Sequence, residues 1–105
     1  MDAPDPLTRR HVLVRGRVQG VGFRWFAKEL AGTLGLSGWA RNRDDGSVEL
    51  EVEGTPAAAD EFVRRLRDGN PEARVREIVA VPVAPRGGSG FEIRQGERWN
   101  RPPTP

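Results

Sequence analysis

Apolar residues follow two different spacings along the chain, one typical of strands and the other of helices. In the segment 48–53, three aliphatic residues alternate with three glutamates, which predicts a strand with one buried face and one solvent-exposed face. Between residues 23 and 34, Phe26, Leu30 and Leu34 recur at four-residue steps, which predicts an amphipathic helix. The chain therefore combines strands with helices.

The ends of a second helix are marked by residues that favour helix termini. Thr55 suits the N-cap position, and Pro56 suits the first helical position. Phe62 and Leu66 then supply an apolar side, and Gly69 ends the segment. These features predict a helix that begins at residue 56.

The remaining apolar runs are short and rich in β-branched residues. They predict strands at 11–18, 38–43, 74–83 and 91–94, and Asp44-Asp45-Gly46 is a hairpin turn signal. The resulting order is β-α-β-β-α-β with a short final strand. That order predicts a ferredoxin-like βαββαβ sandwich of the α+β class, in which two helices cover one face of an antiparallel sheet.

The length of 105 residues suits a single domain. We expect the domain to span residues 9–95, with flexible tails at 1–8 and 96–105, where prolines cluster. No apolar run approaches the roughly 18 residues of a transmembrane helix, and the acidic, Pro-containing N-terminus does not resemble a signal peptide. We therefore expect a cytoplasmic monomer with no membrane partner.

The scarcity of Cys and His excludes several kinds of chemistry. The chain has no Cys and a single His, His11, which excludes a disulfide scaffold, a Cys-ligated metal site and a thiol nucleophile. We expect no metal and no cofactor. His11 is interpreted as a structural residue, and Trp25 and Trp39 as packing residues of the core or of a lid.

The basic composition is weak evidence for a nucleic-acid partner. The isoelectric point is near 10.3, yet the formal net charge is only +2. Lys28 is the only lysine, so few groups titrate between neutral pH and the lysine pKa of about 10.4. The high isoelectric point therefore reflects missing buffering groups more than a large excess of positive charge.

The predicted topology brings two distant segments together. The first strand, the first helix and the second strand alternate in direction. The loop at 16–24 and the turn at 42–46 should therefore lie at the same end of the domain, although they are separated in sequence.

The first of these segments has the composition of an anion-binding loop. Gly16, Gly20 and Gly22 lie between a strand and a helix, where backbone N–H groups can turn toward one point at the positive end of the helix dipole. Arg24, in the first helical turn, can bind two oxygens of a phosphate or carboxylate. The alternative is that the glycines only build a tight turn and that Arg24 lies on an exposed face.

The second segment contributes Asn42, whose amide can both donate to and accept from a bound water. The alternative is a turn residue that bonds its own backbone. Asp44 and Asp45 are interpreted as turn residues and not as a general base.

The two segments together resemble the acylphosphatase family. The resemblance is carried by the segments 16–25 (GRVQGVGFRW), 38–42 (GWARN) and 45–49 (DGSVE), and it extends from about residue 10 to 94. It implies hydrolysis of acyl phosphates to carboxylate and inorganic phosphate, without a metal or cofactor and with a small-molecule substrate as the only partner.

The resemblance also implies roles for individual residues. Arg24 would bind the phosphate, and Asn42 would position the attacking water. The backbone amides that complete the phosphate cradle would be those of Gln19, Gly20, Val21, Gly22 and Phe23. The chain departs from the family at Arg43, where many relatives carry a small hydroxyl residue after the asparagine.

Two other functions are compatible with the element order. RNA-recognition domains share it, but they carry stacking aromatic residues on their first and third strands. The segments 11–14 and 48–51 contain none, and the glutamates of the latter would repel phosphate, so we expect no nucleic-acid partner. The other alternative is a non-catalytic anion-binding domain, related to the acylphosphatase module of larger carbamoyl-handling maturation proteins.

Overall fold

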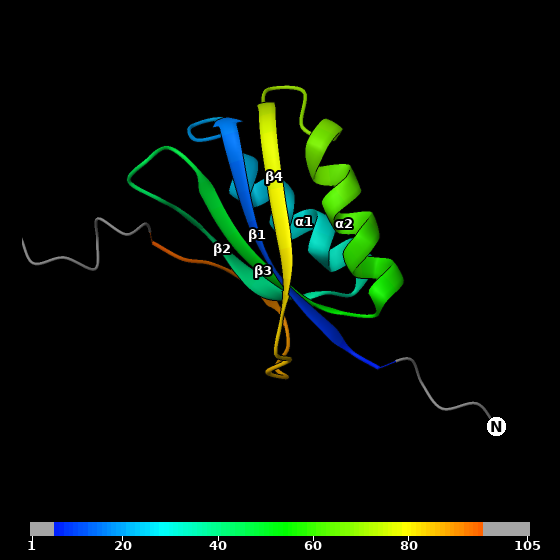
Figure 1. Cartoon of the computed structure of the whole chain (residues 1–105). Helices are drawn as coiled ribbons and strands as arrows, with labels where there is room; N and C mark the ends of the chain where they lie inside the picture. The colour runs from blue at the N-terminus through cyan, green and yellow to red at the C-terminus, as the bar shows by residue number, and fades with distance from the viewer. Residues whose placement is uncertain (1–5, 96–105) are drawn as a thin grey trace, which may run out of the picture.

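A twisted five-stranded sheet with two helices on one of its faces forms the domain in the computed structural model (Figure 1). The structure describes residues 6–95, so residues 1–5 of the tail expected at 1–8, and the whole tail expected at 96–105 with Trp99, lie outside the described residues. The elements in chain order are β1 (Thr8–Arg17), α1 (Phe23–Leu34), β2 (Ser37–Asn42), β3 (Val48–Gly54), α2 (Pro56–Asp68), β4 (Arg74–Val83) and β5 (Phe91–Ile93).

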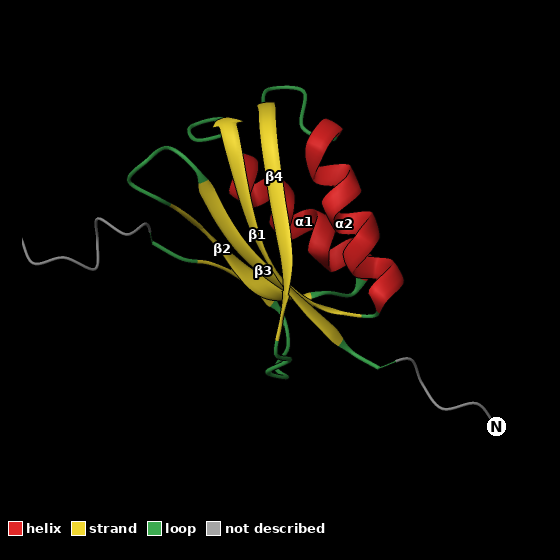
Figure 2. Ribbon diagram, viewed as in Figure 1, coloured by secondary structure: helices red, strands yellow, loops and turns green. Residues whose placement is uncertain are grey.

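The strand order β4-β1-β3-β2-β5 confirms the predicted ferredoxin-like sandwich. Each of the first four strands in this order is antiparallel to its neighbours among them, and Figure 2 shows both helices on the same side of these strands. β5 differs, because it pairs in parallel with β2 through Gly38↔Phe91 and Ala40↔Ile93. The sheet is therefore mixed, and its fifth strand lies beside residues 38–40 of β2 and runs in the direction of Asn42.

Strand β1 begins earlier than the sequence pattern indicates. It starts at Thr8, within the segment expected to be a tail, because residues before His11 pair with β3 through Thr8↔Gly54 and Arg9↔Glu53. The alternation of apolar residues does not extend that far, so the pattern alone could not include them.

The two helices end at the residues that the sequence marks. α1 lies between Gly22 and Gly35, both with left-handed backbone conformations, and the Gly35 amide donates to the last turn. The Thr55 side chain accepts a hydrogen bond from the Ala58 amide, which caps α2. In residues 6–95, no helix is long and apolar enough to cross a membrane.

The hydrophobic core lies between the helices and one face of the sheet. From the sheet it contains Val12 and Val14 of β1 together with Leu50 of β3, all with no exposed surface. Phe23 of α1 and Phe62 of α2 fill the space above them. The core thus fixes β1, β3 and α1 relative to one another. These elements adjoin the β1–α1 loop and the β2–β3 hairpin.

The expectation of a solvent-exposed acidic face on β3 is wrong. Glu49, Glu51 and Glu53 are only 7%, 7% and 4% exposed, although they lie on the open face, which is the sheet face that no helix covers. Arg9 Nε donates to Glu51 Oε1 over 2.5 Å, and Arg9 Nη1 donates to Glu53 Oε1 over 3.2 Å. The glutamates are therefore covered by long cationic side chains of the neighbouring strand and are paired with them.

Glu49 is held in the same way from both sides. His11 Nε2 lies 2.6 Å from one carboxylate oxygen, and Arg41 Nε donates to the other over 2.7 Å. Burial acts to raise the pKa of Glu49, but the hydrogen bonds with His11 and Arg41 outweigh it and hold that pKa below its usual value. His11 is thus a structural partner of Glu49, as the sequence interpretation has it.

Candidate active site

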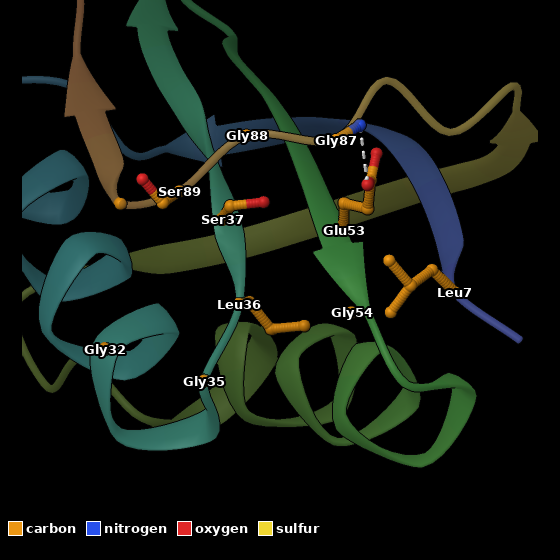
Figure 3. A pocket seen from close by; sticks show the side chains of 11 residues that line it. Leu7, Gly32, Gly35, Leu36, Ser37, Glu53, Gly54, Gly87, Gly88 and Ser89 are labelled. Carbon is orange, nitrogen blue, oxygen red and sulfur yellow. Dashed lines mark hydrogen bonds between the residues drawn. The ribbon is translucent and has the colours of Figure 1, made fainter. Parts of the chain in front are cut away.

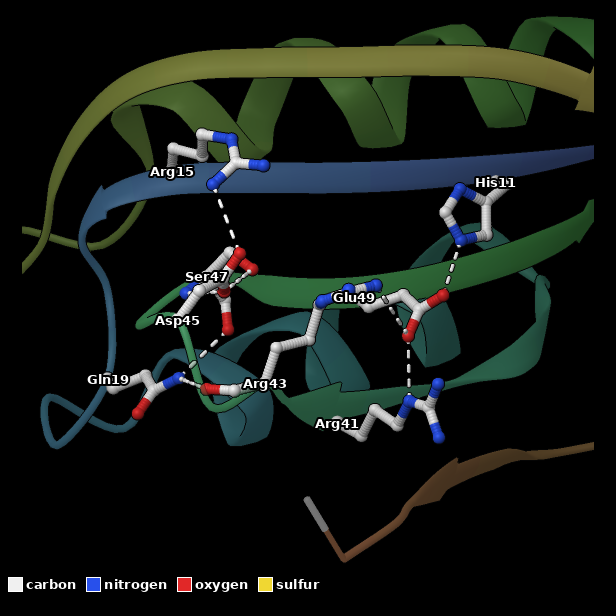
Figure 4. A network of polar contacts seen from close by, with 8 residues as sticks. All are labelled: His11, Arg15, Gln19, Arg41, Arg43, Asp45, Ser47 and Glu49. Carbon is white, nitrogen blue, oxygen red and sulfur yellow. Dashed lines mark hydrogen bonds and ion pairs between the residues drawn. The ribbon is translucent and has the colours of Figure 1, made fainter. Parts of the chain in front are cut away.

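The β1–α1 loop and the β2–β3 hairpin meet at one end of the sheet, which confirms the proximity predicted from topology. The Gln19 side chain joins them, because its Nε2 donates to the Arg43 carbonyl over 2.7 Å and to the Ser47 carbonyl over 2.9 Å (Figure 4). The partners are 24 and 28 residues away in sequence. This end of the domain therefore combines two segments that only the fold brings together.

The loop has a backbone conformation that requires glycine. Gly20 and Gly22 have φ of 75° and 74°, in the left-handed region that other residues rarely adopt. Val18 and Phe23, at either end of the loop, are buried in the core. The loop is also held by Asn70, whose Nδ2 donates to the Val21 carbonyl over 3.3 Å. Anchors on three sides therefore give the loop a defined shape.

The backbone amides of this loop are available to a ligand. The backbone amides of residues 19–23 donate no hydrogen bond to any acceptor within residues 6–95. Gly22 is the N-cap of α1, it provides no side-chain cap, and the first turn contains no acidic residue. The positive end of the helix dipole is thus left without a negative partner, which favours an anion at this point.

Arg24 lies beside the strand that carries Asn42. Its Nη1 donates to the Arg94 carbonyl over 3.2 Å, and the Arg94 amide donates to the Ala40 carbonyl over 2.8 Å. Because β5 runs parallel to β2, the Arg94 carbonyl lies beyond Ala40 in the direction of Asn42. The guanidinium is therefore held at the end of the sheet where Asn42 lies.

The Asn42 side chain points to the helix-covered face of the sheet. It is two residues after the buried Ala40 and pairs with the buried Val48, and both positions share its face. In the part of the chain that the structure describes, the buried Asn42 Oδ1 has no hydrogen-bond partner. A buried acceptor without a partner costs about 1–3 kcal/mol, which makes such atoms candidates for a functional role.

Arg43 lies on the other face, away from Asn42. Its Nη1 is 3.7 Å from Glu49 Oε1, so this arginine joins the charged groups of the open face. Asp45 is a turn residue, as expected, because its Oδ1 accepts from the Ser47 amide over 3.0 Å. Hydrogen bonds from the Ser47 hydroxyl and amide, with a contribution from Arg15, lower the pKa of Asp45 to about 2.

The two tryptophans differ in their surroundings. Trp39 is buried on the open face, where the guanidinium of Arg94 lies 4.7 Å from its ring centroid. Trp25, next to Arg24 in sequence, is 61% exposed, so of the two expected kinds of packing, core or lid, the core is wrong for this residue. Lys28, one helical turn later, covers part of its ring. Trp25 is therefore on the outer side of α1.

A hollow lies away from this site, at the opposite end of the sheet (Figure 3). It has a volume of about 440 Å³ and is lined mainly by glycines, with Leu36 and Glu53 among them. The Glu53 carboxylate already accepts from the amides of Arg86 and Gly87 and pairs with Arg9. Residues 6–95 contain no group of three or more His, Asp or Glu side chains suited to hold a metal ion.

The chain matches known proteins over most of its length. The family model described as Acylphosphatase matches residues 10–93. An acylphosphatase from Moorella thermoacetica is 50% identical over 88 residues, which cover 84% of this chain and 95% of that relative.

Solved structures agree with this match. The crystal structure of acylphosphatase from Bacillus subtilis has a TM-score of 0.80 and 39% identity, and the alignment covers 85% of this chain and 99% of that one. Full-length HypF in its phosphate- and nucleotide-bound form has a TM-score of 0.83 and 26% identity, over 92% of this chain and 13% of that one. The chain belongs to the acylphosphatase family and is an enzyme that hydrolyses acyl phosphates.

Proposed function

We propose that the chain hydrolyses acyl phosphates without a metal ion, at the end of the sheet where the β1–α1 loop meets the β2–β3 hairpin. The phosphate group would bind in the cradle formed by the amides of residues 19–23, next to the Arg24 guanidinium. The observation that carries this assignment is the loop itself, whose amides donate to no acceptor in residues 6–95 at the uncompensated N-terminus of α1. Backbone N–H groups and a planar guanidinium are well suited to bind phosphate oxygens.

Arg24 and the cradle supply the positive charge that the reaction needs. Phosphoryl transfer passes through a loose transition state with charge spread over the equatorial oxygens, so positioning and charge stabilisation account for most of the catalysis. Arg24 is held by the Arg94 carbonyl and has no carboxylate partner among the described residues. Its full charge is therefore available to the transferred phosphoryl group.

Asn42 positions the attacking water. Its buried Oδ1, which has no partner in residues 6–95, would accept a hydrogen bond from the water and orient an oxygen lone pair toward phosphorus. The bond between phosphorus and the carboxyl oxygen breaks as the bond to water forms. The products are a carboxylate and inorganic phosphate, and a proton of the water is transferred to a phosphoryl oxygen of the substrate.

No strong acid or base is required for this reaction. A carboxylate is a good leaving group, so it departs without protonation. The Asp45 carboxylate in the hairpin has a pKa of about 2 and accepts hydrogen bonds from Ser47 and Arg15. Such a weak base suits a role in the turn and leaves the proton to the substrate.

We expect the purified chain to hydrolyse benzoyl phosphate at an undiminished rate after exhaustive treatment with EDTA. Inorganic phosphate should inhibit competitively, because it occupies the same cradle. The measurement is the initial rate of hydrolysis with and without chelator, over a series of phosphate concentrations. A rate that falls in EDTA and returns with a divalent cation would contradict metal independence, and insensitivity to phosphate would contradict the cradle.

The alternative of a non-catalytic anion-binding domain is not favoured by the comparisons, because relatives named as acylphosphatases match most of the chain. Turnover of benzoyl phosphate distinguishes the two functions. Absence of a nucleic-acid partner, a monomeric state and a cytoplasmic location stay predictions from the sequence. The β3 glutamates do not form the exposed acidic surface that was expected to repel RNA, because they are paired with cations and largely covered.

A further inference from the structure

The Gln19 side chain connects the loop 18–22 to the hairpin 42–47 through two hydrogen bonds. Both bonds come from the same Nε2 group, at 2.7 Å to the Arg43 carbonyl and 2.9 Å to the Ser47 carbonyl. Because carbonyl oxygens only accept, both protons of the carboxamide are engaged and its orientation is fixed.

The two acceptors lie on opposite sides of the hairpin, Arg43 directly after β2 and Ser47 directly before β3. The Ser47 carbonyl also accepts from the Arg43 amide over 2.9 Å, and the Arg43 carbonyl also accepts from the Gly46 amide over 3.2 Å. Gln19 thus adds a third donor to the hydrogen-bonded pair that closes the hairpin. Figure 4 shows this side chain reaching from the loop to Arg43 and Ser47.

The contact lies directly beside the residue proposed to position the water. Asn42 immediately precedes Arg43, and it is the last residue of β2. A shift of the Arg43 carbonyl therefore moves the Asn42 backbone with it. Gln19 is at the same time part of the cradle, through its backbone amide. One side chain thus connects the phosphate cradle to the water-positioning residue.

We propose that the Gln19 side chain is a positioning residue that sets the distance between the phosphate cradle and Asn42. The inference rests on the proposed function. Its backbone amide binds phosphate, whereas its side chain acts through Asn42 and touches neither the substrate nor the water. In-line attack depends on where the water stands relative to phosphorus, and a misplacement of about 1 Å can cost on the order of 10²-fold in rate.

The test is a double-mutant cycle between Gln19→Met and Asn42→Ala. Methionine keeps the length of the side chain and removes the donor, while the backbone amide remains. We expect Gln19→Met to lower kcat for benzoyl phosphate about 10- to 100-fold, with the inhibition constant for phosphate changed less than about threefold. In the Asn42→Ala background the same substitution should change kcat less than about threefold, because residues that act as a unit are not additive.

Asn70→Leu is the matched control. It removes a side-chain amide from the same loop, at the Val21 carbonyl, but it does not touch the hairpin. The effects of Asn70→Leu and Asn42→Ala on kcat should therefore be independent, so that the double variant shows the product of the two single fold-changes. Unfolding midpoints measured for every variant separate a loss of fold from a loss of positioning.

Gln19→Glu provides a second readout should Gln19→Met fail to fold. An ionised carboxylate would face two carbonyl oxygens, whereas a protonated carboxyl can donate to one of them. Its kcat relative to the parent enzyme should rise as the pH falls toward the carboxyl pKa of about 4.3 or above. A ratio that is independent of pH would contradict the role of the donor.

The outcomes separate the two proposals. Suppose that Asn42→Ala is slow and that Gln19→Met lowers its kcat by the same factor as it lowers the parental kcat. This result would overturn the positioning role of Gln19 and leave the proposed function in place. A Gln19→Met enzyme with parental kcat does the same. An Asn42→Ala enzyme with parental kcat overturns the water-positioning role of Asn42, and with it the role of Gln19.

Discussion

Replacing Arg24 by Ala should lower kcat/KM for benzoyl phosphate by about 10³-fold or more. Arginines that stabilise the transferred phosphoryl group in other enzymes contribute 10³–10⁵-fold, and Arg24 is the cation that the structure places at the loop. The loss corresponds to about 4 kcal/mol of transition-state stabilisation. Because the guanidinium also binds the ground-state phosphate, the inhibition constant for inorganic phosphate should rise as well. Steady-state rates over a range of phosphate concentrations measure both effects.

Arg17→Ala is the control for this substitution. Arg17 is an exposed arginine at the end of β1, close to the same loop in sequence. Removing it changes the net charge by the same amount, so its effect reports only general electrostatic attraction, which falls with ionic strength. Equal losses in Arg17→Ala and Arg24→Ala would contradict the assignment of Arg24.

Replacing Asn42 by Ala should lower kcat by about 10²–10³-fold, the range found when one preorganised polar group is removed from an active site. The expected signature differs from that of Arg24. Asn42 contacts the water and not the phosphate, so the inhibition constant for phosphate should stay within about threefold of the parent value. Core packing should survive, because the neighbouring Ala40 and Val48 are untouched.

Two results would contradict the role of Asn42. The first is a parental kcat in a folded variant. The second is a loss that appears only as weaker phosphate binding, which would place Asn42 in the cradle. Thermal unfolding followed by circular dichroism shows whether the variant is folded, since an alanine in the last position of β2 should cost little stability.

The helices and most strands could be predicted because their signals are local. Thr55 and Pro56 begin α2, Gly22 and Gly35 flank α1, and the structure places both helices within these limits. The start of β1 could not be predicted in this way. Residues 8–10 belong to the strand because of their partners on β3 and β4, and those partners are distant in sequence.

The acidic face of β3 shows the same limit in another form. The alternation of aliphatic residues with glutamates in 48–53 indicates that the two faces of the strand differ. It does not indicate which side chains cover the polar face. The register of the sheet decides that, because it places Glu51 opposite His11 and Glu53 opposite Arg9. Glutamates expected in solvent are therefore buried in ion pairs, and a sequence pattern alone does not contain this information.

The sequence motifs lead to the candidate site residues, whose roles stay predictions, but only in part to the contacts that hold these residues in place. Arg24 and Asn42 follow from two motifs, and topology places their segments at one end of the domain. The role of the Gln19 side chain was missed, since its partners are backbone carbonyls at Arg43 and Ser47 that no motif marks. The topology predicts that the loop and the hairpin lie close together, and from this a hydrogen-bond donor between them could have been expected.

The most direct test of the account is a titration of the isotope-labelled chain with inorganic phosphate, followed by NMR. It reports where the anion binds, independently of turnover. We expect saturable shifts of the backbone amides of residues 19–23 and of the Arg24 Nε–H, and their loss in Arg24→Ala. Arg17, Arg74 and Arg76 line a separate hollow, and shifts confined to these residues, with the loop amides unchanged, would contradict the assignment of the site.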